Sequence, residues 1–179
     1  MKSQESFWRE LDRVAFANTF AEIYEHSPWV AARSAPSAPV DSLDAALKVM
    51  ADTVAAASLD EQLTLLRAHP DLAGKAALAG DLTAQSAREQ AGAGLDTLSP
   101  EEMVRFTDLN SRYTEKFGFP FIIAVAGLDK HDILAAFDTR ISHTEEEERR
   151  AALEQVHRIA RVRAERLIED YLATSGATP

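Results

Sequence analysis

Cysteine is absent from this sequence of 179 residues, and glycine and proline are scarce, with seven of each. Without cysteine the chain forms no disulfide, carries no thiolate nucleophile and holds no Cys-ligated zinc or iron–sulfur cluster. No apolar run approaches the roughly 20 residues that a membrane-spanning helix needs, and the N-terminal segment lacks the apolar stretch of a signal peptide. We therefore expect a soluble, cytoplasmic protein that does not act at a membrane.

Positive charge is scarce as well. The sequence has 19 Lys and Arg residues against 29 Asp and Glu residues, which gives a formal net charge of -10. An acidic surface argues against non-specific binding to nucleic acid. Several site patterns are also missing, namely HExxH, the P-loop, the Rossmann glycine pattern and GxSxG. We expect neither a metal ion nor an organic cofactor.

The residues that are present favour one helical domain. The hydrophobic content of 46% is typical of globular proteins, and a chain of this length buries roughly 70% of its unfolded surface in a single core. Apolar residues recur at helical spacing, and alternating stretches of strand type are nearly absent. We predict an all-α fold in one domain over residues 1–179, a compact bundle of about seven to eight helices with a long C-terminal helix.

The helix boundaries follow from capping residues and breaks. Capping boxes open three helices, at Ser58–Glu61, Ser99–Glu102 and Thr144–Glu147, and residues 31–39 have the composition of a loop. The apolar run 119–127 is expected to be buried, but its periodicity does not distinguish a helix from an extended segment. The predicted helices cover residues of about 6–25, 42–56, 58–69, 82–90, 99–117, 130–141 and 144–173.

The last predicted helix carries an arginine on its apolar face. Arg163 lies in the middle of the buried stripe, where an unpaired charge is strongly destabilising. It therefore extends its charged end to solvent, pairs with an internal Asp or Glu, or binds an anionic ligand, and the sequence leaves these interpretations open. The stripe runs through Leu153, Val156, Ala160, Arg163, Leu167 and Tyr171.

A second unusual segment is Arg67–Lys75, in which His69 stands at a helix end directly before Pro70. A histidine at a helix C-terminus can simply bond free carbonyl groups. A rigid proline and a small-residue turn that ends in Gly74, however, hold an imidazole in place and leave room for a ligand. Histidine is also the side chain best suited to proton transfer near neutral pH. Both interpretations stay open at this point.

A third group lies on the helix predicted at 82–90. Ser86, Glu89 and Gln90 are three and four residues apart, so they share one helical face. This face offers a hydroxyl, a carboxylate and an amide, either to solvent or to a ligand.

Several blocks of the sequence form a pattern that extends along nearly the whole chain, from Phe7 to about Leu172. They are His69–Lys75, Ser86 with Glu89 and Gln90, Ala93–Leu95, Asn110, Tyr113, Lys116–Phe121, Ile159, Ala160 and Arg163. This pattern resembles the OHCU decarboxylase family, where OHCU is 2-oxo-4-hydroxy-4-carboxy-5-ureidoimidazoline, an unstable intermediate of urate breakdown. The blocks HPDLAGK and KFGFPF, in this order, are the specific part of the resemblance.

The resemblance implies an all-α enzyme, usually a homodimer, that converts OHCU to (S)-allantoin and CO₂ without a metal or an organic cofactor. It implies His69 as the catalytic acid/base, with Glu89 and Arg163 as further catalytic residues. Many members have leucine after this arginine, where this chain has Ala164. That departure makes Arg161 an alternative, which the apolar stripe disfavours. The implied substrate contacts are Pro70, Ser86, Ala87, Arg88, Glu89, Gln90, Phe121, Ile122, Ile123, Ala124, Val125 and Arg163.

Two other functions remain open from the sequence. A cofactor-free hydrolase of a related cyclic ureide would use His69 and Glu89 to activate water, and it would release no CO₂. An acidic helical interaction module would show an exposed apolar stripe instead of a pocket with histidine, glutamate and arginine.

Overall fold

The computed structural model describes residues 3–174, except for the side chain of Ala76, and this part of the chain contains helices and no strand. The all-α prediction is therefore confirmed. The chain forms two compact units: unit 1 comprises Met1–Leu65 and His157–Pro179, and unit 2 comprises Leu66–Val156. None of the described helices is long and apolar enough to cross a membrane.

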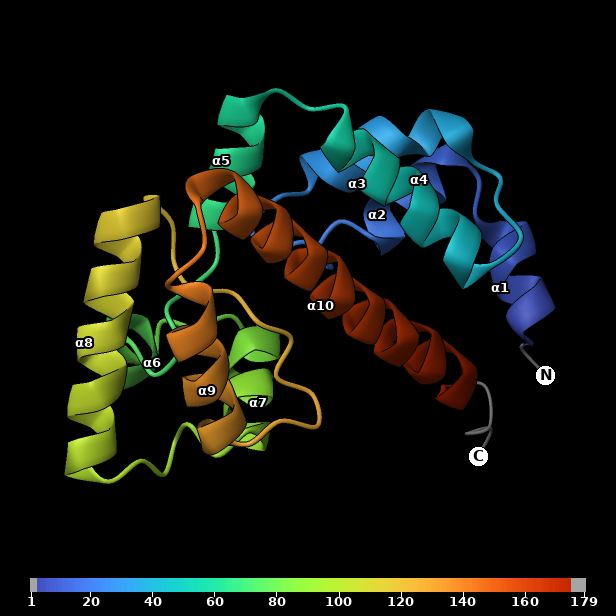
Figure 1. The fold of residues 1–179 in the computed structure, drawn as a ribbon. Helices are drawn as coiled ribbons and strands as arrows, with labels where there is room; N and C mark the ends of the chain where they lie inside the picture. Colours follow the sequence, from blue (N-terminus) through green and yellow to red (C-terminus); the bar gives the residue numbers. More distant parts are fainter. Residues whose placement is uncertain (1–2, 175–179) are drawn as a thin grey trace. The chain divides into compact units, whose positions relative to one another are not determined.

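Unit 1 contains the N-terminal helices and the C-terminal part of the longest helix. Its elements are α1 (Gln4–Glu10), α2 (Arg13–Thr19), α3 (Trp29–Ser34), the 3-10 helix η1 (Ala35–Ser37), α4 (Leu43–Ala55), most of α5 (Leu59–Arg67) and the end of α10 (Glu145–Ala173). Helix α2 packs on α3, and α3 packs on α4, as the blue and cyan ribbons of Figure 1 show. The long C-terminal helix was predicted correctly to its last residue.

The single helix predicted over residues 6–25 is wrong, because the chain forms α1 and α2 there. The Asp12 carboxylate accepts a hydrogen bond from the N–H of Ala15 at 2.8 Å and begins a new helix. Val14, which helical spacing places on the buried face, is 69% exposed. The loop predicted at 31–39 is also wrong, since α3 and η1 cover most of it.

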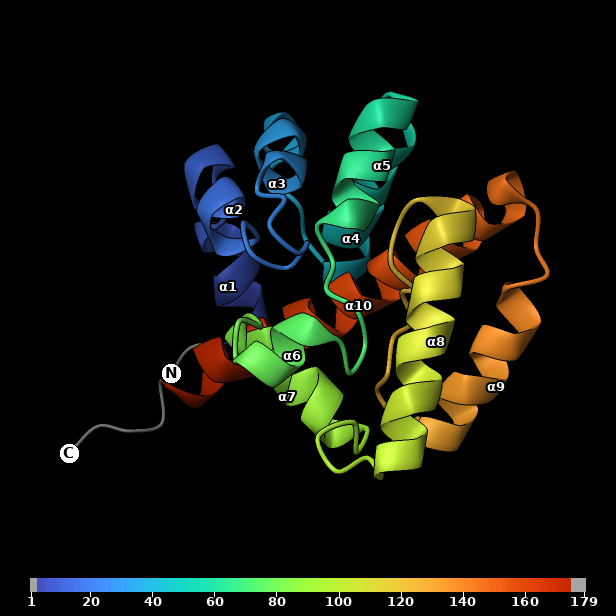
Figure 2. The same ribbon diagram turned by 90° about the vertical axis from the view of Figure 1, so that its left-hand side faces the viewer.

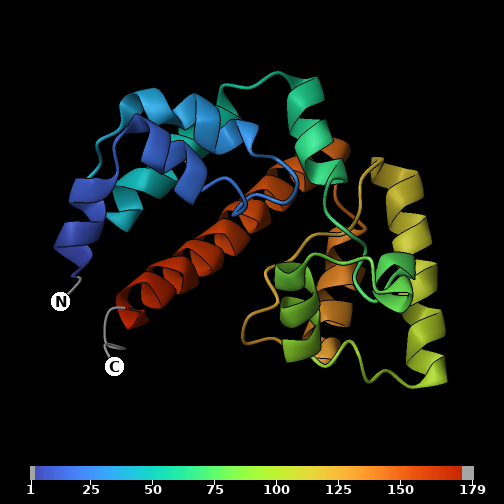
Figure 3. The same ribbon diagram turned by 180° about the vertical axis from the view of Figure 1, so that it is seen from behind.

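Unit 2 contains four complete helices and the first turns of α10. The four are α6 (Lys75–Ala79), α7 (Ala84–Gly92), α8 (Pro100–Phe117) and α9 (Lys130–Arg140). Helices α8 and α9 lie side by side, as the yellow and orange ribbons show in Figures 1 and 2, and Figure 3 gives the same helices from behind. Phe106 of α8 meets Phe137 of α9 edge-on, with 6.2 Å between ring centroids. The sequence did not predict the short α6.

The predicted capping boxes are all present. Ser99 accepts a hydrogen bond from the N–H of Glu102, whose carboxylate accepts one from the N–H of Ser99. The same reciprocal bonds occur at Ser58–Glu61 and Thr144–Glu147. Gly118 follows α8 with a φ of 74°, a left-handed conformation that ends the helix.

The apolar run 119–127, whose conformation the sequence left open, is neither helix nor strand. Its rings enter the core of unit 2. Phe121 stacks on Phe137 with 3.7 Å between ring centroids and meets Tyr113 edge-on at 5.2 Å. Because no regular secondary structure satisfies the backbone of this run, its N–H and carbonyl groups rely on turns, side chains, water or ligands.

Candidate active site

His69 lies just beyond the end of α5, which stops at Arg67. Its backbone N–H donates to the carbonyl of Leu66 at 3.2 Å, and the following Pro70 disfavours a helical conformation at His69. His69 is only 7% exposed. The predicted acid/base is therefore an interior imidazole at the start of a loop, residues 69–74, which we call the histidine loop.

Two amide side chains hold the histidine loop. Gln90 of α7 accepts a hydrogen bond from the N–H of Ala73 at 2.9 Å and donates one to the carbonyl of Asp71 at 3.3 Å. Asn110 of α8 donates to the carbonyl of Leu72 at 2.8 Å. Both amides are buried. Helices α7 and α8 therefore fix the loop backbone at three consecutive residues.

The histidine loop makes a tight turn. Ala73 has a φ of 50°, in the left-handed region. A Cβ added to Gly74 would lie 2.5 Å from the Cβ of Asp71, so the turn requires glycine there. Burial raises the pKa of the Asp71 carboxyl, and the positive charge of Lys75 opposes this shift. The turn thus places a carboxyl group where its charged form is disfavoured.

Helix α7 presents only part of the predicted group 86–90 to the interior. Ser86 and Gln90 are buried, and Glu89 is half-buried beside them. Ala87 and Arg88, which were also predicted to contact substrate, lie on the exposed side of the helix.

The predicted contacts 121–125 lie in a stretch that we call the apolar segment, residues 119–125. Its members from Phe121 onward are buried or half-buried. The N–H groups of Ile122, Ile123 and Val125 make no hydrogen bond to any other residue that the structure describes. Backbone N–H groups without a partner in the protein can bond water or a ligand, so these groups are suited to donate to the oxygen atoms of a ligand.

Two side chains anchor the apolar segment through its backbone. Arg140, the last residue of α9, donates from Nη1 to the carbonyl of Ile122 at 2.7 Å. Gln155 of α10 accepts a hydrogen bond from the N–H of Ala124 at 3.1 Å. One anchor is thus a charged guanidinium and the other a neutral amide.

A buried ionic cluster holds Arg140 in turn. Glu148 is 0% exposed and accepts hydrogen bonds from Nε of Arg140 at 2.9 Å and from Nη2 at 2.5 Å. Nδ1 of His143 lies 2.7 Å from the other carboxylate oxygen, and the Tyr113 hydroxyl also donates to Glu148. Burial and the neighbouring carboxylate raise the pKa of the Tyr113 hydroxyl.

Arg163 belongs to unit 1, where it pairs with Glu25. Nη1 of Arg163 lies 2.6 Å from Oε2 of Glu25, and the two side chains are 3% and 2% exposed. Arg161 is exposed and pairs with Asp44 at 2.6 Å. The apolar stripe therefore distinguished the buried arginine from the exposed one, and the structure gives that arginine an internal carboxylate partner.

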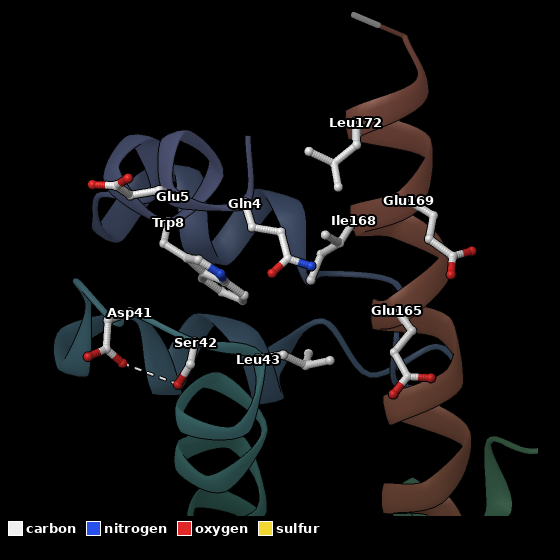
Figure 4. A pocket seen from close by; sticks show the side chains of 10 residues that line it. All are labelled: Gln4, Glu5, Trp8, Asp41, Ser42, Leu43, Glu165, Ile168, Glu169 and Leu172. Atoms are coloured by element: carbon white, nitrogen blue, oxygen red, sulfur yellow. Dashed lines mark hydrogen bonds between the residues drawn. The ribbon is translucent and has the colours of Figure 1, made fainter. Parts of the chain in front are cut away.

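Two further observations concern ligands. Unit 1 contains an open pocket of about 410 Å³ between α1, the start of α4 and the end of α10, which Figure 4 shows from close by. None of the predicted site residues lines it; the lining residues are Gln4, Glu5, Trp8, Asp41, Ser42, Leu43, Glu165, Ile168, Glu169 and Leu172. Among residues 3–174, no three His, Asp or Glu side chains are grouped so that they could hold a metal ion.

The sequence analysis missed the residues that hold the site in place. Asn110 entered it only as part of the family pattern, and Arg140 and Glu148 did not enter it. A signal was available, because Arg140 follows Ile133 and Phe137 at helical spacing. It is therefore an arginine on an apolar face, the same criterion that singled out the arginine of the last helix.

Comparison with known sequences identifies relatives along most of the chain. The model of the family described as OHCU decarboxylase matches residues 9–165. A 2-oxo-4-hydroxy-4-carboxy-5-ureidoimidazoline decarboxylase of Haloferax volcanii is 46% identical over 153 residues, which cover 86% of this chain and 89% of that protein. A uric acid degradation bifunctional protein of Bacillus subtilis is 39% identical over 169 residues, which cover 94% of this chain and 33% of that protein.

Two solved structures are similar to this chain. The crystal structure of (S)-allantoin synthase matches with a TM-score of 0.70 and 33% identity, over 93% of this chain and 54% of that one. The crystal structure of an OHCU decarboxylase in the presence of (S)-allantoin matches with a TM-score of 0.69 over 84% of this chain and 98% of that one. Its identity to this chain is 22%, so it supports the fold alone.

Proposed function

The chain belongs to the OHCU decarboxylase family, and from this premise we propose that it converts OHCU to (S)-allantoin and CO₂, with His69 as the acid/base. It acts as a carboxy-lyase of urate degradation. The observation that carries the proposal is a buried imidazole on a loop whose backbone is fixed by two buried amides. Because the family match includes residues of both units, we propose that residues 1–179 act as one functional domain.

The reaction sets three demands on the protein. Loss of CO₂ leaves an electron pair on the ring carbon that carried the carboxylate, and a carbonyl or imine of the substrate's own ring accepts this pair. The protein has to bind a polar, anionic molecule in a mostly dry pocket. It also has to stabilise negative charge where it develops. Finally, it has to deliver one proton to one face of the neighbouring ring carbon, which bears the ureido group, while the carbon that lost CO₂ becomes a carbonyl as its hydroxyl gives up its proton.

His69 serves the proton transfer in this proposal. It lies at the carboxylate end of the substrate, assists the departure of CO₂ and then delivers the proton. Delivery to one face gives a single enantiomer of allantoin. Fixed geometry between reacting groups contributes strongly to rate, and the hydrogen bonds that hold the histidine loop support such geometry.

The remaining residues bind and orient the substrate. Glu89 accepts hydrogen bonds from ureido or ring N–H groups, and Arg163 donates to ring or carbonyl oxygens as charge develops. The N–H groups of Ile123 and Val125 supply further donors to substrate oxygens. The other proposed contacts are Pro70, Ser86, Ala87, Arg88, Gln90, Phe121, Ile122 and Ala124. The family resemblance also supports a homodimer, which light scattering of the purified protein would detect as twice the mass of the chain.

The test of the activity is circular dichroism of allantoin formed from freshly generated OHCU, with and without the protein. We expect rapid growth of a signal from a single enantiomer, together with release of CO₂. Only the slow, racemic background would refute the decarboxylase function. A changed product without CO₂ would identify a hydrolase instead.

Substitution of the histidine tests the mechanism. His69→Asn should lower kcat by about 100-fold or more, the contribution of a general acid or base, while allantoin still binds. His131→Asn is the matched control, because His131 is an exposed histidine of the same unit. Near-normal turnover by His69→Asn would end the assignment of His69.

A further inference from the structure

We propose that Arg140 and Glu148 are positioning residues for the decarboxylation, because together they set the backbone of the apolar segment against the substrate. This inference rests on the proposed function, in which the N–H groups of Ile123 and Val125 bind substrate oxygens. Neither Arg140 nor Glu148 touches the substrate in this proposal. They act through the carbonyl of Ile122.

The guanidinium of Arg140 donates hydrogen bonds from two of its edges, one to Glu148 and the other to the apolar segment. Its Nε and Nη2 both bond Glu148, at 2.9 and 2.5 Å, while Nη1 donates to the carbonyl of Ile122 at 2.7 Å. The same group lies over the ring of Phe121, 4.5 Å from its centroid. Because a guanidinium is planar and its donors have fixed directions, orienting one edge on Glu148 also orients the other edge on the apolar segment.

The carboxylate of Glu148 is itself held on several sides. It is fully buried, and it accepts from the Tyr113 hydroxyl and lies 2.7 Å from Nδ1 of His143 in addition to its bonds with Arg140. A carboxylate with this many partners has a defined position. Arg140 therefore has a fixed support from which to hold the carbonyl of Ile122.

Stability alone does not account for this cluster. Buried ion pairs are weak evidence for stability, since replacing a whole pair with apolar residues of similar volume is often neutral or favourable. The apolar segment, in contrast, has no helix or strand to fix it. The N–H of Ile123 belongs to the same planar peptide group as the carbonyl that Arg140 binds, so fixing that carbonyl also fixes this N–H. A shift of about 1 Å in binding groups can lower the rate about 100-fold. A catalytic role in positioning this carbonyl therefore explains why Arg140 and Glu148 are buried here.

The decisive experiment removes the charges without leaving any of them unpaired. In the triple variant Tyr113→Phe/Arg140→Met/Glu148→Leu the whole buried cluster becomes apolar, and His143 is 32% exposed and can be solvated. We expect a urea midpoint close to that of the wild type and a kcat/KM about 100-fold lower. Wild-type kcat/KM in the folded triple variant would overturn the inference.

A second variant keeps the test decisive if the triple variant does not fold. Arg140→Lys retains a positive charge for Glu148 but lacks the second edge that reaches Ile122. It should remain folded and lose kcat/KM by about 10-fold or more, again by displacement of the segment. Full activity in Arg140→Lys would refute positioning by the guanidinium.

The matched control removes an exposed pair from α8 and α9, the helices that carry Tyr113 and Arg140. Arg105 of α8 lies 2.9 Å from Asp138 of α9, and both side chains are more than half exposed. Arg105→Gln/Asp138→Asn should leave both stability and kcat/KM unchanged. Absence of decarboxylase activity in the wild type would instead overturn the proposed function, so the two failures are distinguishable.

Discussion

The histidine loop and the apolar segment are both irregular stretches that carry predicted site residues, but different chemistry holds each of them. Neutral amides hold the histidine loop, with Gln90 and Asn110 bonded to backbone groups of three consecutive residues. A buried charge holds the apolar segment, with Arg140 on a carbonyl and Glu148 behind it. The support of the histidine loop is divided between two neutral amides. The support of the apolar segment combines one neutral amide, Gln155, with a guanidinium whose charge depends on Glu148.

This difference predicts how each stretch responds to damage. An amide side chain has a donor and an acceptor and needs no counter-charge, so losing one leaves only neutral backbone groups unpaired. Losing Arg140 leaves the carboxylate of Glu148 buried in a protein interior without its main partner. The ionic support is therefore intolerant of single substitutions, whereas the amide support fails by degrees.

The largest effect is expected from Arg140→Met alone. Removing one partner of a buried pair costs about 3–5 kcal/mol, because it leaves an uncompensated charge. Urea unfolding followed by far-ultraviolet circular dichroism measures this loss. A loss below about 1 kcal/mol, the range of exposed pairs, would contradict the distinction between the two supports. Adding Glu148→Leu and Tyr113→Phe should recover most of the stability.

The amide support should show a smaller, graded effect. Gln90→Leu removes the partner of the Ala73 N–H and of the Asp71 carbonyl, and the second bond is only partly buried, so we expect a total loss of about 1–3 kcal/mol. Asn110→Leu should cost less. It leaves only the carbonyl of Leu72 unpaired, and it removes an Oδ1 that is buried without a partner among the described residues.

Unfolding free energies of the two variants, measured in the same urea series, decide this comparison. Equal losses, or a larger loss for Asn110→Leu, would show that the bonds to the loop are not its main support. Both variants should also turn over more slowly, since the loop carries the acid/base.

Local chemistry explains what could be predicted of the fold. The helices capped by Ser58, Ser99 and Thr144 could be predicted because the residues of a capping box lie only three positions apart in the sequence. Their side chains satisfy N–H groups at the start of the helix. The break at Asp12 was missed because a single capping residue inside a continuous helical spacing looks like an ordinary polar position. The helix α3 was missed because the prolines that favour a loop, Pro36 and Pro39, follow its last residue, Ser34.

The sequence could single out His69 and Arg163 as candidate site residues, but not the side chains that hold them. A histidine before a proline and an arginine in an apolar stripe are visible in one segment, so His69 and Arg163 were singled out. The partners are distant in sequence: Glu25 is 138 residues from Arg163, and Asn110 is 38 residues from the carbonyl that it holds. No local pattern specifies such pairs, because tertiary packing brings them together.

The third prediction concerns Gly74, where the histidine loop has no room for a side chain. Gly74→Ala would put a Cβ 2.5 Å from the Cβ of Asp71, so the loop backbone has to shift, at a cost of about 1–3 kcal/mol for overpacking. Gly92→Ala is the control, since nothing lies within 4 Å of a Cβ at that position in α7. The midpoint temperature of thermal unfolding and kcat/KM should both fall for Gly74→Ala and stay unchanged for Gly92→Ala. Equal behaviour of the two variants would show that the turn has room to adapt.

The smallest effect is expected at Asp71 of the histidine loop, where burial disfavours the charged form of the carboxyl group. Burial raises its pKa in the folded protein above the ordinary value of 3.8. A group whose pKa is raised by folding contributes full stability below its unfolded pKa, and that contribution is lost as pH rises through the folded pKa. Asp71→Asn abolishes this loss, so the variant should gain stability relative to the wild type as pH rises from 4 to 7.

Urea midpoints at several pH values measure this gain. Asp96→Asn, which removes the same charge from an exposed position in unit 2, should follow the wild type at every pH. If Asp71→Asn is instead less stable at pH 7 than at pH 4 relative to the wild type, attraction to Lys75 outweighs burial. The histidine loop would then depend on an ion pair, and its contrast with the apolar segment would be one of degree.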